Sequence, residues 1–239
     1  MKKLLLLVCI SLSICSLVAC GSKNDSTTSL PDGSIVESTV TGKGEEQGDV
    51  LNQTTADVSM ETLRNLPITP ESDFDISPYE EDSVILGAYK GSDNAIAIPD
   101  TIGGKRVVSI MGYSYANDTK LVGIRLPDSV TKMDEMVFTN SESLKYVILG
   151  SGLKELPAST FLNCPKLENI KLNEGLNLIG EMCFSNCISL TSIYIPESVT
   201  EIGEGAFFAV GNNFTIEGKA GSYAETYANA NNIPFKAVQ

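Results

Sequence analysis

Apolar side chains recur along this chain with a period of 23 residues. Four units with the same pattern begin at Leu121, Leu144, Leu167 and Leu190. Positions 1, 4, 6, 10, 13 and 18 of each unit are apolar, and position 18 is always phenylalanine. A side chain that recurs at a fixed interval occupies the same place in successive structural repeats. The pattern therefore predicts a repeat solenoid in which each unit forms one coil.

Positions 4 to 6 of every unit alternate apolar, variable and apolar residues. Successive side chains of a strand point to opposite faces, so positions 4 and 6 are expected to point inward and position 5 outward. Stacked coils would then form a parallel sheet with strands about 4.8 Å apart. One coil cannot bury its apolar side alone, but neighbouring coils make a continuous core.

The ends of the repeat array depart from the pattern. A weaker unit at 93–120 fits after five extra residues near GGKRV, and it precedes units at 121–143, 144–166, 167–189 and 190–212. Upstream, alternating segments predict a β-hairpin of Asp73–Ser77 with Ser83–Lys90 that caps the first coil. Downstream, at 213–239, a degenerate coil precedes a short helix that would cover the last coil. Ser222 and Glu225 form its candidate capping box.

Two further positions recur between units. Position 20 is asparagine at 117, 140, 163 and 186, which predicts a buried side chain bonded to the backbone of a turn. Position 21 is Cys164 and Cys187 in adjacent units, while serine and valine occupy it elsewhere. A small packing position of this kind favours buried thiols, and a disulfide remains the alternative. Cys183 lies at a similarly variable position and has the same interpretation.

The repeat resembles a known family. LTSIYIPESVTEIGEGAFF and IAIPDTIGGKRVVSI are similar to the BspA-like bacterial leucine-rich repeats, whose units follow L-x-x-I-x-I-P-x-S-V-T-x-I-G-x-x-A-F-x-x-C. The resemblance covers about residue 83 to the end, and Gly150 and Pro157 depart from it at local turns. It implies a right-handed leucine-rich-repeat coil. It also implies binding to extracellular proteins or host surfaces, with adhesion as the broad function.

The first twenty residues predict export and lipidation. Lys2 and Lys3 precede an apolar stretch that is too short for a bilayer span, so residues 1–19 are a candidate signal peptide. The end of this stretch, LVAC, resembles the lipobox of bacterial lipoproteins, which implies lipidation of Cys20 and anchoring in the cell membrane on its extracellular face. An ordinary secretory signal is the alternative.

Residues 20–71 are predicted to form a tether, and 72–239 the folded domain. The stretch after Cys20 is rich in serine, threonine, glycine and acidic residues, and such segments bury too little apolar surface to order. Within it, SMETLRNL predicts a short helical turn with Ser59 and Thr62 as candidate caps.

The composition argues against several functions. The chain has 30 acidic and 17 basic residues, a net charge of −13 and no histidine. The charge argues against nucleic-acid binding. The missing histidine removes the most frequent general base and metal ligand, and no nucleophile–base pair or phosphate loop is apparent. We therefore expect no enzyme activity, cofactor or metal.

A binding face is the remaining candidate site. The outward positions 3 and 5 of the strands gather aromatic, apolar and cationic side chains: Arg125, Tyr146, Ile148, Lys171 and Tyr194. Aromatic residues and arginine are enriched in binding hot spots, although strand propensity alone can place tyrosine and isoleucine there. The leading hypothesis is a surface-tethered protein that binds a protein partner. A structural envelope scaffold without a soluble ligand is the alternative, and a hydrolase or redox enzyme is the least supported.

Overall fold

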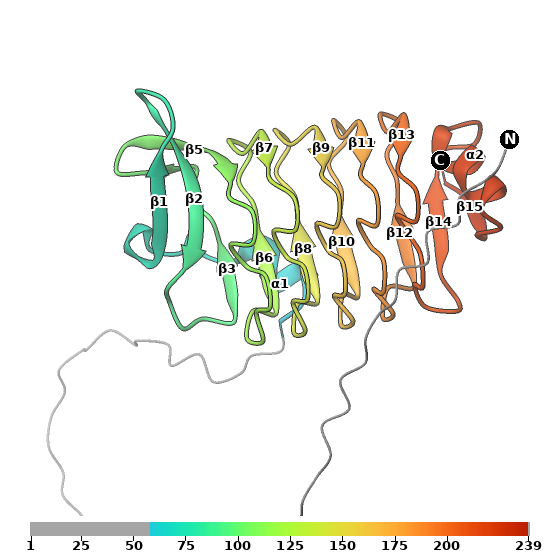
Figure 1. The fold of residues 1–239 in the computed structure, drawn as a ribbon, viewed down its shortest axis with the longest axis horizontal. Helices are drawn as coiled ribbons and strands as arrows, with labels where there is room; N and C mark the ends of the chain where they lie inside the picture. The colour runs from blue at the N-terminus through green and yellow to red at the C-terminus, as the bar shows by residue number, and fades with distance from the viewer. Residues whose placement is uncertain (1–57, 239) are drawn as a thin grey trace, which may run out of the picture. The chain divides into compact units, whose positions relative to one another are not determined.

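The repeat units form stacked coils. The computed structural model describes residues 58–238, so the signal peptide, Cys20 and the tether up to residue 57 lie outside the described residues. In Figure 1 the coils follow one another in a row, and each contributes a strand to the same side. Backbone bonds join position 18 of one coil to position 17 of the next, such as Phe138 N to Thr160 O at 2.9 Å and Phe161 N to Cys183 O at 2.9 Å. The predicted solenoid is confirmed.

Short parallel strands follow one another along one side of the solenoid, as the repeat predicted, and their pairing divides them into a four-stranded and a three-stranded sheet. Equal positions pair: Gly123 lies opposite Tyr146, and Tyr146 opposite Asn169. In the four regular units the strand covers positions 3 to 5, one residue earlier than the alternation suggested. The strands are β3 (Ala95–Ala97), β6 (Gly123–Arg125), β8 (Tyr146–Ile148), β10 (Asn169–Lys171), β12 (Ser192–Tyr194), β14 (Thr215–Gly218) and β15 (Phe235–Ala237).

A second row of two-residue strands lies at positions 12 and 13. Its members are β7 (Lys132–Met133), β9 (Glu155–Leu156), β11 (Leu178–Ile179) and β13 (Glu201–Ile202). Strands β9, β11 and β13 pair in parallel, and β7 pairs with the first coil. The sequence predicts the inward side chain at position 13 but not this strand, because two residues are too few to show alternation.

The core is a set of side-chain columns that run from coil to coil. The four leucines that begin the units are all buried, as predicted. The phenylalanines of position 18 stack with ring centroids 5.1 to 5.4 Å apart and nearly parallel planes. Tyr115 extends this column at one end and Phe214 at the other. Spacings of 4.5–7 Å are those that aromatic pairs favour.

The first coil carries the predicted hairpin. Strands β1 (Phe74–Pro78) and β2 (Ser83–Tyr89) are antiparallel, a one-turn 3-10 helix (Glu71–Asp73) precedes them, and β2 pairs in parallel with β5 (Lys105–Ile110). The extra residues near GGKRV form a second hairpin of β4 (Thr101–Ile102) with β5, whose turn uses two glycines with positive φ. That β1 and β2 cap the solenoid stays a prediction.

The last coil is followed by the predicted helix. Helix α2 (Tyr223–Ala230) begins at Ser222, whose side chain accepts a bond from Glu225 N. The Glu225 carboxylate in turn accepts a bond from Gly221 N at 2.6 Å. Ala224 and Ala228 belong to the hydrophobic core. The Ser222 half of the predicted capping box is therefore confirmed, whereas Glu225 accepts from the residue before Ser222 and Ser222 N donates to Lys219 O. The role of α2 as a cap stays a prediction. No helix within residues 58–238 has the length and apolar content needed to cross a membrane.

Residues 58–71, which we call the strap, pack on the outer face of the sheet. Helix α1 (Met60–Asn65) begins at Ser59, whose side chain caps Thr62 N. It lies against β3, β6 and β8, and Leu63 is 0% exposed. The predicted helical turn is confirmed. The packing of residues 58–71 on the sheet is not visible in the sequence, because Leu63 stands among polar residues. The predicted boundary between tether and folded domain at residues 71 and 72 stays a prediction.

A glycine provides the space for the strap. A Cβ atom on Gly123 would lie 3.0 Å from Val58 Cγ1 and 3.4 Å from Leu63 Cδ1. The equivalent position is Tyr146 in the next coil and Asn169 in the one after. Downstream, Thr69 N donates to Ala97 O at 2.9 Å, and Ala97 N donates to Thr69 Oγ1 at 3.0 Å. The strap is thus fixed by apolar contacts at one end and by hydrogen bonds at the other.

We predict that Phe161→Ala lowers the free energy of unfolding by about 3–5 kcal/mol, because it leaves a cavity between two stacked rings. Chemical denaturation monitored by circular dichroism measures this. Leu162→Ala is the matched control. Leu162 is only half-buried, so its removal should lower the free energy of unfolding by less. Equal losses in the two variants would contradict the importance of the column.

We predict that Gly123→Tyr detaches the strap and leaves the solenoid folded. The new ring cannot occupy the same space as Val58 and Leu63. The backbone at residue 123 is already in a strand, a conformation that tyrosine adopts readily, so β6 itself should stay folded. Hydrogen exchange at residues 60–66 should rise strongly while exchange at Phe161 and Phe184 stays slow. Ser192→Tyr, at the equivalent exposed position of β12, should change neither. Unchanged protection of α1 in Gly123→Tyr would refute the close packing described here.

Candidate functional site

The five predicted site residues do lie on one face of the sheet. Arg125, Ile148 and Lys171 are the last residues of β6, β8 and β10 and pair in register, while Tyr146 begins β8 and Tyr194 ends β12. We call this side of the sheet the outer face. The structure therefore brings the predicted set together as a row rather than as a converging cluster.

Their exposure differs along the row. Lys171 is exposed, Tyr194 is 40% exposed, and Arg125 and Tyr146 are half-buried. Ile148 is only 9% exposed, which differs from the solvent-facing place that the alternation predicted. The reason is that α1 packs against β8. The strap thus covers the outer face over the first three coils and leaves β10 and β12 open.

Arg125 is held in place by the strap. Its Nη2 donates to the carbonyl oxygen of Leu66 at 2.7 Å. Its Nε is buried and has no hydrogen-bond partner. No carboxylate within residues 58–238 forms an ion pair with this guanidinium, so its positive charge is uncompensated at short range.

Glu168 compensates part of the predicted positive charge. Lys145, which also faces this region, forms an ion pair with Glu168 at 3.3 Å. The hydroxyl of Tyr146 donates to the same carboxylate at 2.8 Å. Lys171 has no ion pair in the described part of the chain. Of the cations on the face, Arg125 and Lys171 are therefore the ones that could form an ion pair with an acidic group of a partner.

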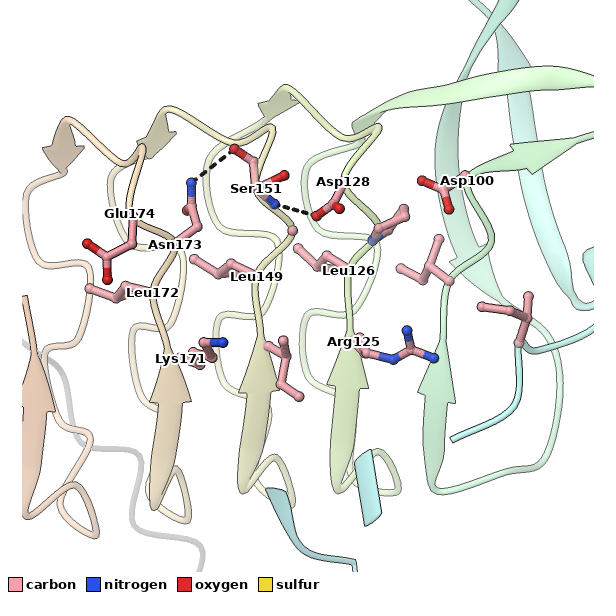
Figure 2. Close-up of a pocket in the computed structure, with 15 residues that line it drawn as sticks. Asp100, Arg125, Leu126, Asp128, Leu149, Ser151, Lys171, Leu172, Asn173 and Glu174 are labelled. Atoms are coloured by element: carbon pink, nitrogen blue, oxygen red, sulfur yellow. Dashed lines mark hydrogen bonds between the residues drawn. The ribbon is translucent and has the colours of Figure 1, made fainter. Parts of the chain in front are cut away.

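A groove of about 490 Å³ runs past the ends of β6, β8 and β10, and we call it the strand-end groove (Figure 2). Its floor is the apolar row Leu126, Leu149 and Leu172. Figure 2 shows Arg125 and Lys171 near the strand ends on one side of this floor. It shows carboxylates on the other side, at the bends that follow the strands. These carboxylates belong to Asp100, Asp128 and Glu174.

Hydrogen bonds fix the bends that carry the carboxylates. Asp128 Oδ1 accepts from Ser151 N at 2.7 Å, and this bond holds the pKa of the Asp128 carboxyl below its usual range. Asn173 donates through Nδ2 to Ser151 O at 3.2 Å and to Leu153 O at 2.8 Å. The Oδ1 atom of Asn173 is buried without a partner. The groove is therefore a rigid surface with charged side chains on both sides.

A second groove of about 330 Å³ lies between the strap and the uncovered coils. Met60 and Arg64 of the strap line it together with Lys171, Tyr194 and Glu217. Glu217 is paired with Lys236 at 2.9 Å. The contribution of Arg64 could not be predicted, because nothing in the sequence indicates that the strap lies against the sheet beside β10 and β12.

The recurring asparagines do not have the predicted environment. Their backbones have φ between 57° and 61°, the left-handed region that asparagine tolerates better than most residues. Their side chains form a ladder of amides along the solenoid, with Nδ2 to Oδ1 distances of 3.1, 2.9 and 2.7 Å. They are exposed or half-buried rather than buried. The period revealed their equivalence, but not the backbone conformation that aims one amide at the next.

The cysteines are structural. Cys164, Cys183 and Cys187 are free and buried, which confirms the buried-thiol interpretation. Cys164 Sγ donates to Phe138 O at 3.1 Å, and burial raises the pKa of this thiol to about 12. Burial also raises the pKa of Cys183 and Cys187. A reactive cysteine needs an accessible thiolate, which these lack. No group of acidic or sulfur ligands in residues 58–238 could hold a metal ion.

Comparison with known proteins identifies the repeat type and proteins of similar structure. Residues 92–215 match the BspA type leucine rich repeat region in six copies. The chain is similar to a leucine rich repeat protein of T. pallidum, with 30% identity and a TM-score of 0.59 over 63% of this chain and 71% of that one. It shares the fold of a leucine-rich repeat protein from Bacteroides ovatus, with 24% identity and a TM-score of 0.53 over 61% of this chain and 45% of that one. No curated protein matches.

Leucine-rich repeat proteins are generally non-enzymatic scaffolds, and this family suggests protein–protein interaction or a role at a surface. The match spans more than half of the chain, and the repeat period, the parallel strands and the phenylalanine column all agree with it. The chain belongs to the BspA type leucine-rich-repeat family.

Proposed function

We propose that this chain is a lipid-anchored protein of the bacterial cell surface that binds a protein partner through the open part of its outer face. The family supports the general role, and the signal-like N-terminus with its lipobox supports the location. Extracellular or host proteins are the expected partners, and adhesion is the expected consequence of binding them.

The observation that carries this proposal is the contrast between the two halves of the outer face. Over β3, β6 and β8 the strap already fills the sheet surface. Over β10 and β12 an exposed tyrosine, Tyr194, and an unpaired cation, Lys171, remain open beside Arg64. Tyrosine and arginine are the side chains that most often dominate binding energy at interfaces. A partner is therefore expected to contact β10, β12 and the edge of the strap.

A structural envelope scaffold remains the second candidate. The strap favours it, because a surface that an intramolecular segment covers offers less area to a soluble ligand. Specific interfaces bury about 800 Å² on each partner, so binding requires most of the uncovered coils. Recovery of only cell-envelope proteins by the immobilised full chain would favour the scaffold.

We predict that Tyr194→Ala weakens binding to a captured partner by about 2 kcal/mol, as expected for an aromatic hot spot. An array of extracellular and host proteins, probed with the full chain, supplies the partner, and titration calorimetry measures the loss. Tyr223→Ala is the matched control, because this tyrosine of α2 is 39% exposed but lies outside the outer face. Equal affinities for the parent and Tyr194→Ala would reject the proposed face.

We predict that Cys20→Ser abolishes membrane association. Stable anchoring requires more than one acyl chain, and the cysteine sulfur is the expected attachment point. Detergent phase partitioning of the parent and the variant from the same cells measures the effect. Cys164→Ser is the control, since its buried thiol has no role in anchoring. A Cys20→Ser protein that still partitions with the membrane would exclude this anchor.

A further inference from the structure

The strand-end groove has opposite charges on its two sides. Position 5 of the units supplies Arg125 and Lys171, and position 8 supplies Asp100, Asp128 and Glu174. Figure 2 shows the two sets on opposite sides of the leucine floor. Because the coils repeat in register, the charges form two parallel rows along the solenoid rather than a mixed patch.

The rows do not neutralise each other. No ion pair joins them within residues 58–238, and two residues of chain lie between position 5 and position 8 in each coil. Arg125 uses a backbone carbonyl as its partner, and its Nε has none. Asp128 accepts from a backbone N–H and forms no ion pair with a cation in the described part of the chain. Because hydrogen bonds already hold Arg125 and Asp128, a ligand would order these two side chains at little cost in conformational entropy.

We propose that the strand-end groove binds an extended segment of a partner protein in which acidic and basic side chains alternate. Successive side chains of an extended chain point to opposite sides. A segment lying along the groove would direct its acidic side chains toward Arg125 and Lys171. Its basic side chains would then face Asp128 and Glu174, and its backbone would lie over the leucine floor. This inference rests on the proposed function, because it assumes that the partner is a protein.

The charge pattern argues against simpler ligands. A uniformly acidic segment would meet three carboxylates on the far side of the groove, and a uniformly basic one would meet Arg125 and Lys171. Like charges that are placed close together across an interface are unfavourable. An apolar segment would leave the charges of both rows without partners. The alternating segment is the one that satisfies both rows at once.

Three labelled octapeptides test the proposal with the full chain, carrying Cys20→Ser to keep it in solution. Fluorescence anisotropy compares (Glu-Lys)4 with (Glu-Gln)4 and (Gln-Lys)4 at low and at physiological salt. We expect (Glu-Lys)4 to bind at least about threefold more tightly than either control, and the difference to shrink with salt. Equal binding of the three peptides, or no binding of (Glu-Lys)4, would overturn the inference.

Substitutions on each side then locate the contact. Lys171→Gln should weaken binding of (Glu-Lys)4 toward the level of (Gln-Lys)4, with Arg125 still in place, and Glu174→Gln should weaken it toward the level of (Glu-Gln)4, with Asp128 still in place. Lys120→Gln is the control, since this exposed lysine lies outside the groove. Loss in neither groove variant would overturn the location. A partner whose capture depends on Tyr194 but not on Lys171 or Glu174 would overturn this inference and leave the proposed function standing.

Discussion

Stacking of identical side chains from coil to coil is the interaction on which this structure depends. The phenylalanine column places a ring over a ring at 5.1 to 5.4 Å, slightly more than the distance between neighbouring strands of a sheet. The stacked rings therefore fix the distance between successive coils and the rotation of one coil relative to the next. Because every side chain in the column needs both neighbours, no coil is stable by itself, and the outer face inherits its regularity from the core.

That regularity decides how the face works. Strands of three residues cannot build a deep cleft, so charges and aromatic rings stand in rows that follow the stacking direction. The strap breaks this uniformity. It covers the first coils, holds Arg125 through Leu66 and leaves Lys171 and Tyr194 open. A single small residue, Gly123, permits this arrangement. The functional asymmetry of the face thus comes from a local exception to the repeat.

The sequence predicted the parts of the fold that repeat and missed the parts that occur once. The four leucines and the phenylalanines could be assigned to the core because each has equivalents 23 residues away. Leu63 has no such equivalent, and it packs against Gly123, which is sixty positions away in the sequence. The burial of Ile148 follows from the same contact. Pairing of Lys145 with Glu168 depends on a neighbouring coil and could not be read from one unit.

The placement of the strap has a consequence for how proteins of this kind can change length. Helix α1 of the strap packs mainly on β3, β6 and β8, and the C-terminal helix packs against β14 and β15. Neither helix packs as closely on the strands between them, β10 and β12. An internal duplication of one whole unit there would keep every column in phase. The molecule could thereby gain open surface by tandem copying, whereas an insertion of any other length would put the stacked rings out of step.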